Sequence, residues 1–242
     1  MEEPGGDAAV LRLKHPLTGF DTGRGLAFTT DGNHRWCAVD PRVGATATVV
    51  ESVMNLATVG ARPLALVNCL NFGNPEHPEV MWQLSEAIDG MGDACRSFGL
   101  PVIGGNVSLY NESRGSDIDP TPVIGLLGMV DDLSTPPPGA GLVDGGRILL
   151  LGDTWPGLAG SRWAAHTGQA RLGTLPPCDL EAHTRVANLV RELVVERAVL
   201  GAHDVAEGGL AVALAEMAVR SGVGFSVARI HDEAELWSES GG

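Results

Sequence analysis

The stretch PLALVNCLNFGNPEHPE, residues 63–79, decides the fold of this chain. Pro63 to Leu70 is an apolar run with the length and composition of a buried strand. It passes directly into a loop of asparagines and a glycine, and Pro78 then opens an amphipathic segment. Ligand-binding groups commonly gather where a buried strand meets such a loop. The alternative is a helix-entry turn at Asn74-Pro75, in which the asparagines bond only their own backbone. The residues leave both interpretations open.

On either side of this stretch, apolar residues recur at helical spacing and predict helices. Proline at the start and glycine at the end bound them in the expected way. The predicted helices begin after Pro41 and after Pro78, near Asp179, and at Gly208-Gly209; the first two end at Gly60 and Gly99.

Short apolar runs bounded by turn residues predict strands. Residues 25–29 and 35–39 flank Asp31-Gly32-Asn33, which suits the tight connection of a hairpin. The other predicted strands are 63–70, 101–103, 121–130, 147–151 and 225–230. Strands and helices therefore mix along the whole chain, which favours an α/β and α+β fold.

The densest cluster of proline and glycine, PPPGAG at 136–141, predicts a domain boundary. It separates a first domain, 1–135, from a second, 142–242. The chain stops at 235–242, where another element should follow, so we expect the second domain to be truncated at its C-terminus.

Composition excludes several classes of protein. The 16 basic and 30 acidic residues give a net charge of −14, which argues against a nucleic-acid or anionic-membrane partner. No apolar run approaches the length of a membrane span, and the acidic N-terminus lacks a secretory signal, so we expect a cytoplasmic protein. The four cysteines form no C-x-x-C pair and predict reduced thiols rather than a disulfide framework or a zinc site.

Two further stretches could carry chemistry. In GGNVSLYNE, residues 104–112, the glycines permit close approach of a ligand, and Asn106, Ser108 and Glu112 offer oxygens to a hard cation or a phosphate. In HDVAEGGL, residues 203–210, the N–H groups that open a helix could hold an anion. The alternatives are an ordinary loop or bulge for the first stretch, and a cap beside a structural histidine for the second.

Common nucleotide-binding and catalytic motifs are absent from the sequence. There is no G-x-x-x-x-G-K-[ST], G-x-G-x-x-G, G-x-S-x-G or H-E-x-x-H pattern, and Lys14 is the single lysine. A polyphosphate would therefore have to be met by Mg²⁺, arginine and backbone N–H groups.

Taken together, these stretches closely resemble the synthetase component of the formylglycinamide ribonucleotide amidotransferase (phosphoribosylformylglycinamidine synthase) family of purine biosynthesis. The resemblance rests on 68–83, 104–112, 119–125 and 203–210, and it covers nearly the whole chain. Aminoimidazole ribonucleotide synthetase, thiamine-monophosphate kinase and selenophosphate synthetase share the fold and the use of ATP, but not the GGNVSLYNE stretch.

The resemblance implies a two-domain, aminoimidazole ribonucleotide synthetase-like fold, with an A-type domain at 1–135 and an incomplete B-type domain at 142–242. It matches only the second of two pseudo-symmetric halves. It also implies an ATP-dependent C–N ligase: the amide oxygen of formylglycinamide ribonucleotide is phosphorylated, and ammonia then displaces phosphate to give formylglycinamidine ribonucleotide. A glutaminase subunit supplies the ammonia, and a small accessory subunit completes the amidotransferase complex.

Matched position by position, the resemblance implies that Asn68 and Gly105 contact ATP, Asn106 binds Mg²⁺ and Ser108 binds the substrate. Many members have aspartate where this chain has Asn68, and an amide lacks the charge for direct metal binding. The catalytic histidine of the family belongs to the first half, so no catalytic residue is assigned here and His203 is taken as structural.

Two hypotheses follow. The chain is part of this ligase and acts when the first half completes its pocket, or it is a non-catalytic nucleotide-binding or assembly module of the same fold. A sheet without its partner half would expose apolar surface, which proteins usually avoid. We therefore expect a homodimer formed through residues before Pro136.

Overall fold

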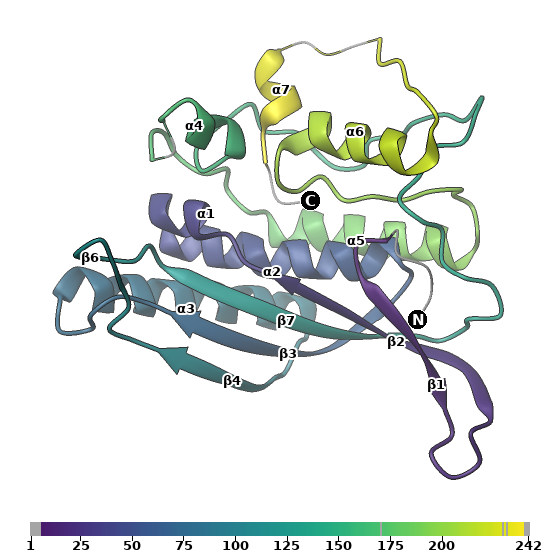
Figure 1. Cartoon of the computed structure of the whole chain (residues 1–242), viewed down its shortest axis with the longest axis horizontal. Helices are drawn as coiled ribbons and strands as arrows, with labels where there is room; N and C mark the ends of the chain where they lie inside the picture. Colours follow the sequence, from purple (N-terminus) through teal and green to yellow (C-terminus); the bar gives the residue numbers. More distant parts are fainter. Residues whose placement is uncertain (1–5, 170, 229, 231, 240–242) are drawn as a thin grey trace.

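The computed structural model describes residues 6–169, 171–228, 230 and 232–239, and its centre is a five-stranded mixed sheet. The strand order is β1-β2-β7-β3-β4, antiparallel throughout except for the parallel pair β3–β4. The strands are β1 (Ala9–Lys14), β2 (Asp21–Asp31), β3 (Arg62–Asn71), β4 (Val102–Ser108) and β7 (Thr121–Val130), with a small hairpin of β5 (Glu112–Ser113) and β6 (Ser116–Asp117). The β1–β2 hairpin projects beyond the rest of the molecule (Figure 1).

Two long helices, α2 (Pro41–Thr58) and α3 (Pro78–Phe98), cover one face of the sheet, and α5 (Leu180–Val195) packs on the outer side of both (Figure 1). The core lies between them, where Ile124 and Leu126 of β7 and Val49 and Leu56 of α2 are almost completely buried. The opposite face of the sheet carries no helix among the described residues.

The regular secondary structure beyond the sheet is helical. It contains α4 (Arg162–His166), α6 (Gly209–Ser221) and α7 (Glu233–Trp237), joined by long irregular segments. No helix in the described part of the chain is long and apolar enough to cross a membrane. All four cysteines are free, as expected.

The predicted helices are confirmed, and their ends follow local chemistry. Asp40 caps α2 by accepting the N–H groups of Arg42 and Val43, and Asp179 caps α5 in the same way. Gly99 ends α3 with a positive φ of 65°, which glycine adopts at little cost. The predicted strands 63–70 and 121–130 are also confirmed, as β3 and β7.

The predicted hairpin of 25–29 with 35–39 is wrong. Residues 35–39 belong to the helix α1 (His34–Val39), and β2 pairs instead with β1 and β7. Asn33, taken as a turn residue, is the N-cap of α1, and its side chain accepts from the N–H groups of Arg35 and Trp36. A five-residue apolar run fits either a strand or a helix, and the cap decides between them.

Three other strand predictions need correction. The strand at 101–103 continues through the glycines, so GGNVS is part of β4 and not a loop after it. Residues 147–151 form no strand, and neither do 225–228 and 230; residue 229 lies outside the described residues. Both segments keep exposed apolar side chains, for example Leu149 at 72%.

Candidate functional site

Two of the four predicted site residues share one face of the sheet. In the β3–β4 pair, Asn106 lies opposite Cys69 and Ser108 lies opposite Asn71. Side chains alternate along a strand, so these two pairs of side chains all point to the face without helices. Asn106 and Ser108 of the edge strand β4, with Cys69 and Asn71 of β3, form a polar line on this face. Within it Asn106 is exposed and Ser108 is half-buried.

The other two residues lie on the opposite side of the pleat. Asn68 is in register with Gly105 on one side and with the fully buried Ile124 on the other, so its side chain points to the helix-covered face. A Cβ at Gly105 would collide with Oδ1 of Asn68. Glycine is therefore required at 105 by Asn68, and the two residues form a unit separate from Asn106 and Ser108.

The two long motifs are interlocked by backbone hydrogen bonds. The N–H of Phe72 donates to the carbonyl of Ser108 at 3.0 Å, and the N–H of Tyr110 donates to the carbonyl of Gly73 at 2.8 Å. The loop after β3 and the segment after β4 thus form one rigid unit at the end of the sheet.

Asp117 of β6 fastens this unit from the other side. It accepts the N–H of Asn74 at 2.7 Å and lies 2.7 Å from Nδ1 of His77. The Asn74 N–H, then His77, hold the pKa of Asp117 below its usual range. Asn74 also accepts the N–H of Glu76 at 2.9 Å, so the helix-entry interpretation of Asn74-Pro75 describes real contacts.

Asn106 alone does not make a magnesium site. Among the described residues its one side-chain contact is weak, from Nδ2 to Sγ of Cys69 at 3.9 Å. Mg²⁺ is usually held by one or two carboxylates together with substrate phosphates and water. The Asn106 amide offers one suitable oxygen, so a magnesium ion here would need its remaining ligands from a bound phosphate or from another part of the protein.

The anion site predicted at Gly208-Gly209 is filled by the chain itself. Oε1 of Glu239 accepts the N–H groups of Gly208 and Arg162, both at 2.7 Å, and the Glu239 side chain is fully buried. A Cβ at Gly209 would collide with the carbonyls of Leu236 and Ser238. The two glycines therefore leave room for residues 236–239, whose Glu239 carboxylate occupies the predicted anion site.

Arg35 links the sheet domain to this region. Its Nη2 bonds Oε1 of Glu207 at 2.7 Å, lies 3.5 Å from Oε2 of Glu239, and its Nε donates to the carbonyl of Gly160 at 3.1 Å. The Arg35 side chain is only 7% exposed. The prediction from sequence missed this residue because it lay in the supposed strand 35–39.

A cluster of acids at the same junction was also missed. Asp31 ends β2, Glu51 lies on α2 and Asp204 precedes α6. Burial, followed by repulsion from Asp31 and Asp204, raises the pKa of Glu51 to about 9. Burial also raises the pKa of Asp31, although Asn55 donates to its Oδ1 at 2.8 Å. These three residues are far apart along the chain, so no sequence pattern reveals that they influence one another.

His203 makes ion pairs through both of its ring nitrogens. Its Nδ1 lies 2.7 Å from Asp7 and 3.3 Å from Asp204, and its Nε2 lies 3.0 Å from Glu216. Although burial opposes the charge, hydrogen bonds to Asp204 and Asp7 outweigh it and raise the pKa of His203 to about 10. The imidazolium therefore ties the start of the chain to α6.

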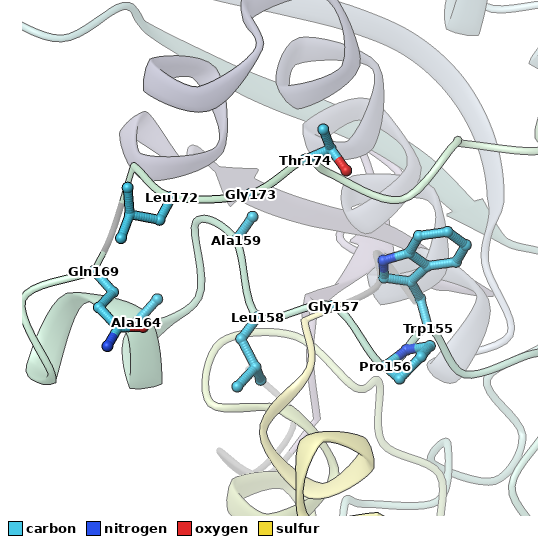
Figure 2. A pocket seen from close by; sticks show the side chains of 10 residues that line it. All are labelled: Trp155, Pro156, Gly157, Leu158, Ala159, Ala164, Gln169, Leu172, Gly173 and Thr174. Atoms are coloured by element: carbon cyan, nitrogen blue, oxygen red, sulfur yellow. The ribbon is translucent and has the colours of Figure 1, made fainter.

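A cavity of about 320 Å³ lies in the second region, away from all four predicted site residues. Figure 2 shows Trp155 and Leu172 on opposite sides of it. Its walls are mostly apolar, and no charged side chain lines it.

The comparisons with known proteins assign the fold. Residues 5–130 match the family described as AIR synthase related protein, N-terminal domain, and residues 143–233 match its C-terminal domain. The chain therefore belongs to the AIR synthase related protein family. The solved structure of AaThiL complexed with AMPPCP and TMP shares this fold, with a TM-score of 0.55 and 20% identity over 92% of this chain and 66% of that one.

Within the family, the chain is similar to PurL. It is 46% identical over 240 residues to the phosphoribosylformylglycinamidine synthase subunit PurL of Moorella thermoacetica, covering 98% of this chain but 32% of the relative. The structure of T. maritima PurL complexed with FGAR aligns with a TM-score of 0.54 and 26% identity, over 78% of this chain and 25% of that one. The chain thus spans about a third of the length of the curated relative.

Proposed function

We propose that this chain is part of an ATP-dependent ligase of purine biosynthesis, which converts formylglycinamide ribonucleotide and ammonia to formylglycinamidine ribonucleotide. The similarity to PurL over nearly the whole chain carries the proposal. It is supported by the way the two motifs of the resemblance, 68–79 and 104–112, interlock at one end of the sheet. A purine-biosynthesis enzyme of this kind would work in the cytoplasm.

In this proposal the two sides of the β3–β4 pair bind different groups. Asn68 and the backbone of Gly105, on the side of the pleat that faces the helices, contact ATP at the edge of the sheet. On the open face, Asn106 offers an amide oxygen to Mg²⁺ and the hydroxyl of Ser108 binds the ribonucleotide. Mg²⁺ would supply charge neutralisation of the transferring phosphoryl group. The rigid unit behind these residues keeps their donors in place, which is the form of help that phosphoryl transfer needs.

The site is one-sided, which supports a composite active centre. The polar line lies on an exposed face at an edge strand, with no second wall among the described residues. We propose that the part of the synthetase beyond this chain provides that wall, that a glutaminase subunit provides ammonia, and that a small accessory subunit joins them.

In the absence of that part, we propose that a second copy of the chain covers the open face as a homodimer. Leu11, Phe28 and Val67 lie on this face and are each about 40% exposed. In an isologous contact the same face of each copy covers the other, so the apolar surface of both copies is buried. Light scattering should give about twice 25.2 kDa at micromolar concentration, and a stable monomer would contradict the pairing.

The test compares the purified chain alone with the chain supplied with the remaining part of a PurL relative. Alone it should show no turnover with ATP, Mg²⁺, ammonia and the ribonucleotide; supplemented, it should be active. In the active form Asn106→Ala and Ser108→Ala should each lose about 10²-fold in rate. Ser85→Ala, an exposed serine on α3, serves as the control.

Turnover by the chain alone would contradict the composite centre. Normal rates for both variants would contradict the assignment of Asn106 and Ser108 to the active site. Nucleotide binding without any turnover in the supplemented protein would favour the non-catalytic module, which the exposed position of the site also suits.

A further inference from the structure

The side chain of Asn111 joins the two motifs at a single point. Its Nδ2 donates to the carbonyls of Phe72 and Ser108, both at 2.9 Å. Its backbone N–H donates to the carbonyl of Phe72 as well, at 3.2 Å. The loop after β3 and the end of β4 are therefore both anchored on this one amide.

The same amide also meets the hydroxyl of Ser108. Oγ of Ser108 lies 3.3 Å from Oδ1 of Asn111 and 3.1 Å from its Nδ2. The amide has two N–H hydrogens, and the two shorter contacts to carbonyls use both of them. Oδ1 is then left as the acceptor for the hydroxyl proton of Ser108.

This last contact is long for a hydroxyl donor, since O–H···O bonds usually measure 2.5–3.0 Å. The proton is thus directed but weakly held. A ligand oxygen at normal distance would take it from Oδ1 without disturbing the two carbonyl contacts that fix the backbone. The arrangement suits a hydroxyl that must be ready to donate to a ligand.

We propose that Asn111 is the positioning residue for Ser108: it fixes the end of β4 through the Ser108 carbonyl and orients the Ser108 hydroxyl toward the bound ribonucleotide. The inference rests on the proposed function, because it takes Ser108 as the substrate contact. Asn111 acts through Ser108 and itself needs no contact with the ligand.

A double-mutant cycle on the supplemented, active protein tests this. Asn111→Ala should raise the KM for the ribonucleotide about tenfold while the KM for ATP changes less than twofold. In a Ser108→Ala background the same change should add less than twofold, because the group it positions is gone. Thr46→Ala is the matched control, since its Oγ1 also lies within hydrogen-bond distance of two backbone carbonyls, those of Arg42 and Gly90, but between α2 and α3 and away from Ser108.

Equal effects of Asn111→Ala with and without Ser108 would overturn the inference, and so would a parallel rise in both KM values matching that of Thr46→Ala. If Asn111→Ala fails to fold, Asn111→Gln keeps an amide with two N–H donors but moves it by one methylene group, so that its oxygen no longer meets the Ser108 hydroxyl in the same place, and the same cycle should again be non-additive. An inactive wild-type protein would refute the proposed function and this inference with it; an active one with an additive cycle would refute the inference alone.

Discussion

The apolar strand β7 is largely buried in the region up to residue 135, but apolar extended segments in the region from 142 onward are exposed. In the first, β7 buries Leu126 beneath α2, leaving it 2% exposed. In the second, 147–151 is equally apolar, yet Leu149 is 72% exposed and has no strand beside it in the part of the chain that the structure describes. Helices form in both regions because their hydrogen bonds are local, whereas a strand needs a neighbour to pair with. Among its described residues the second region forms helices, but its extended segments have no neighbouring strand to pair with.

The largest expected effect is a loss of stability on substituting the helix-covered face of the sheet, compared with the open face. Ile124 and Val67 are both apolar strand residues, but Ile124 is fully buried against the helices and Val67 is 42% exposed on the open face. Ile124→Asp should lose about 4 kcal/mol or more of unfolding free energy, since it buries an unpaired charge. Val67→Asp should cost less than about 1 kcal/mol and instead weaken self-association. Urea unfolding and light scattering measure the two effects; similar losses of stability would show that the open face is covered.

A smaller loss is expected at the junction of the regions. Arg35→Met should cost about 3 kcal/mol, because Glu207 and the buried Glu239 lose their shared cation. Arg185→Met, which removes only an exposed helix pair with Glu181, is the control and should change stability by less than about 0.5 kcal/mol. A result for Arg35→Met as small as the control would mean that the regions are not joined through this arginine.

The pH dependence of stability should have a definite sign. Glu51 binds its proton more tightly folded, with a pKa of about 9, than unfolded, near 4.5. Stability should therefore fall as the pH rises between these values. The pKa of His203 is raised from 6.5 to about 10, so its contribution to stability also falls as the pH rises between these two values. Glu51→Gln should flatten the melting-temperature profile between pH 5 and 9; an unchanged slope would show that Glu51 is not responsible.

The smallest effect is expected in the second region. Leu149→Ser should change the unfolding free energy by less than about 0.5 kcal/mol, because the side chain is already in water. Leu126→Ser, at a buried position of β7, is the matched comparison and should cost about 3 kcal/mol. A loss above about 1 kcal/mol for Leu149→Ser would show that 147–151 is paired in solution.

The features that could be predicted from the sequence are those set by near neighbours. The helix α3 followed from its spacing, Pro78 and Gly99, and the shared face of Asn106 and Ser108 follows from alternation once β4 is known to continue through both. The prediction failed for residues 35–39, where Asn33 suits a turn as well as a helix cap.

Contacts between distant segments could not be predicted. The separation of Asn68 from Asn106 depends on strand register, and the meeting of Asp31, Glu51 and Asp204 depends on how two regions pack. No spacing rule connects positions 31, 51 and 204, and the pKa shifts follow only from their common burial.

The projecting β1–β2 hairpin has a practical consequence. Its turn, residues 15–20, holds Leu17 at 90% exposed and lies away from the packed core (Figure 1). The turn is closed by two hydrogen bonds, from the N–H of His15 to the carbonyl of Phe20 and from the N–H of Gly19 to the carbonyl of His15. Loop length costs little at such a tip, so a tag or fluorophore inserted between Leu17 and Gly19 should leave the sheet intact. The hairpin is therefore a convenient place to label this chain.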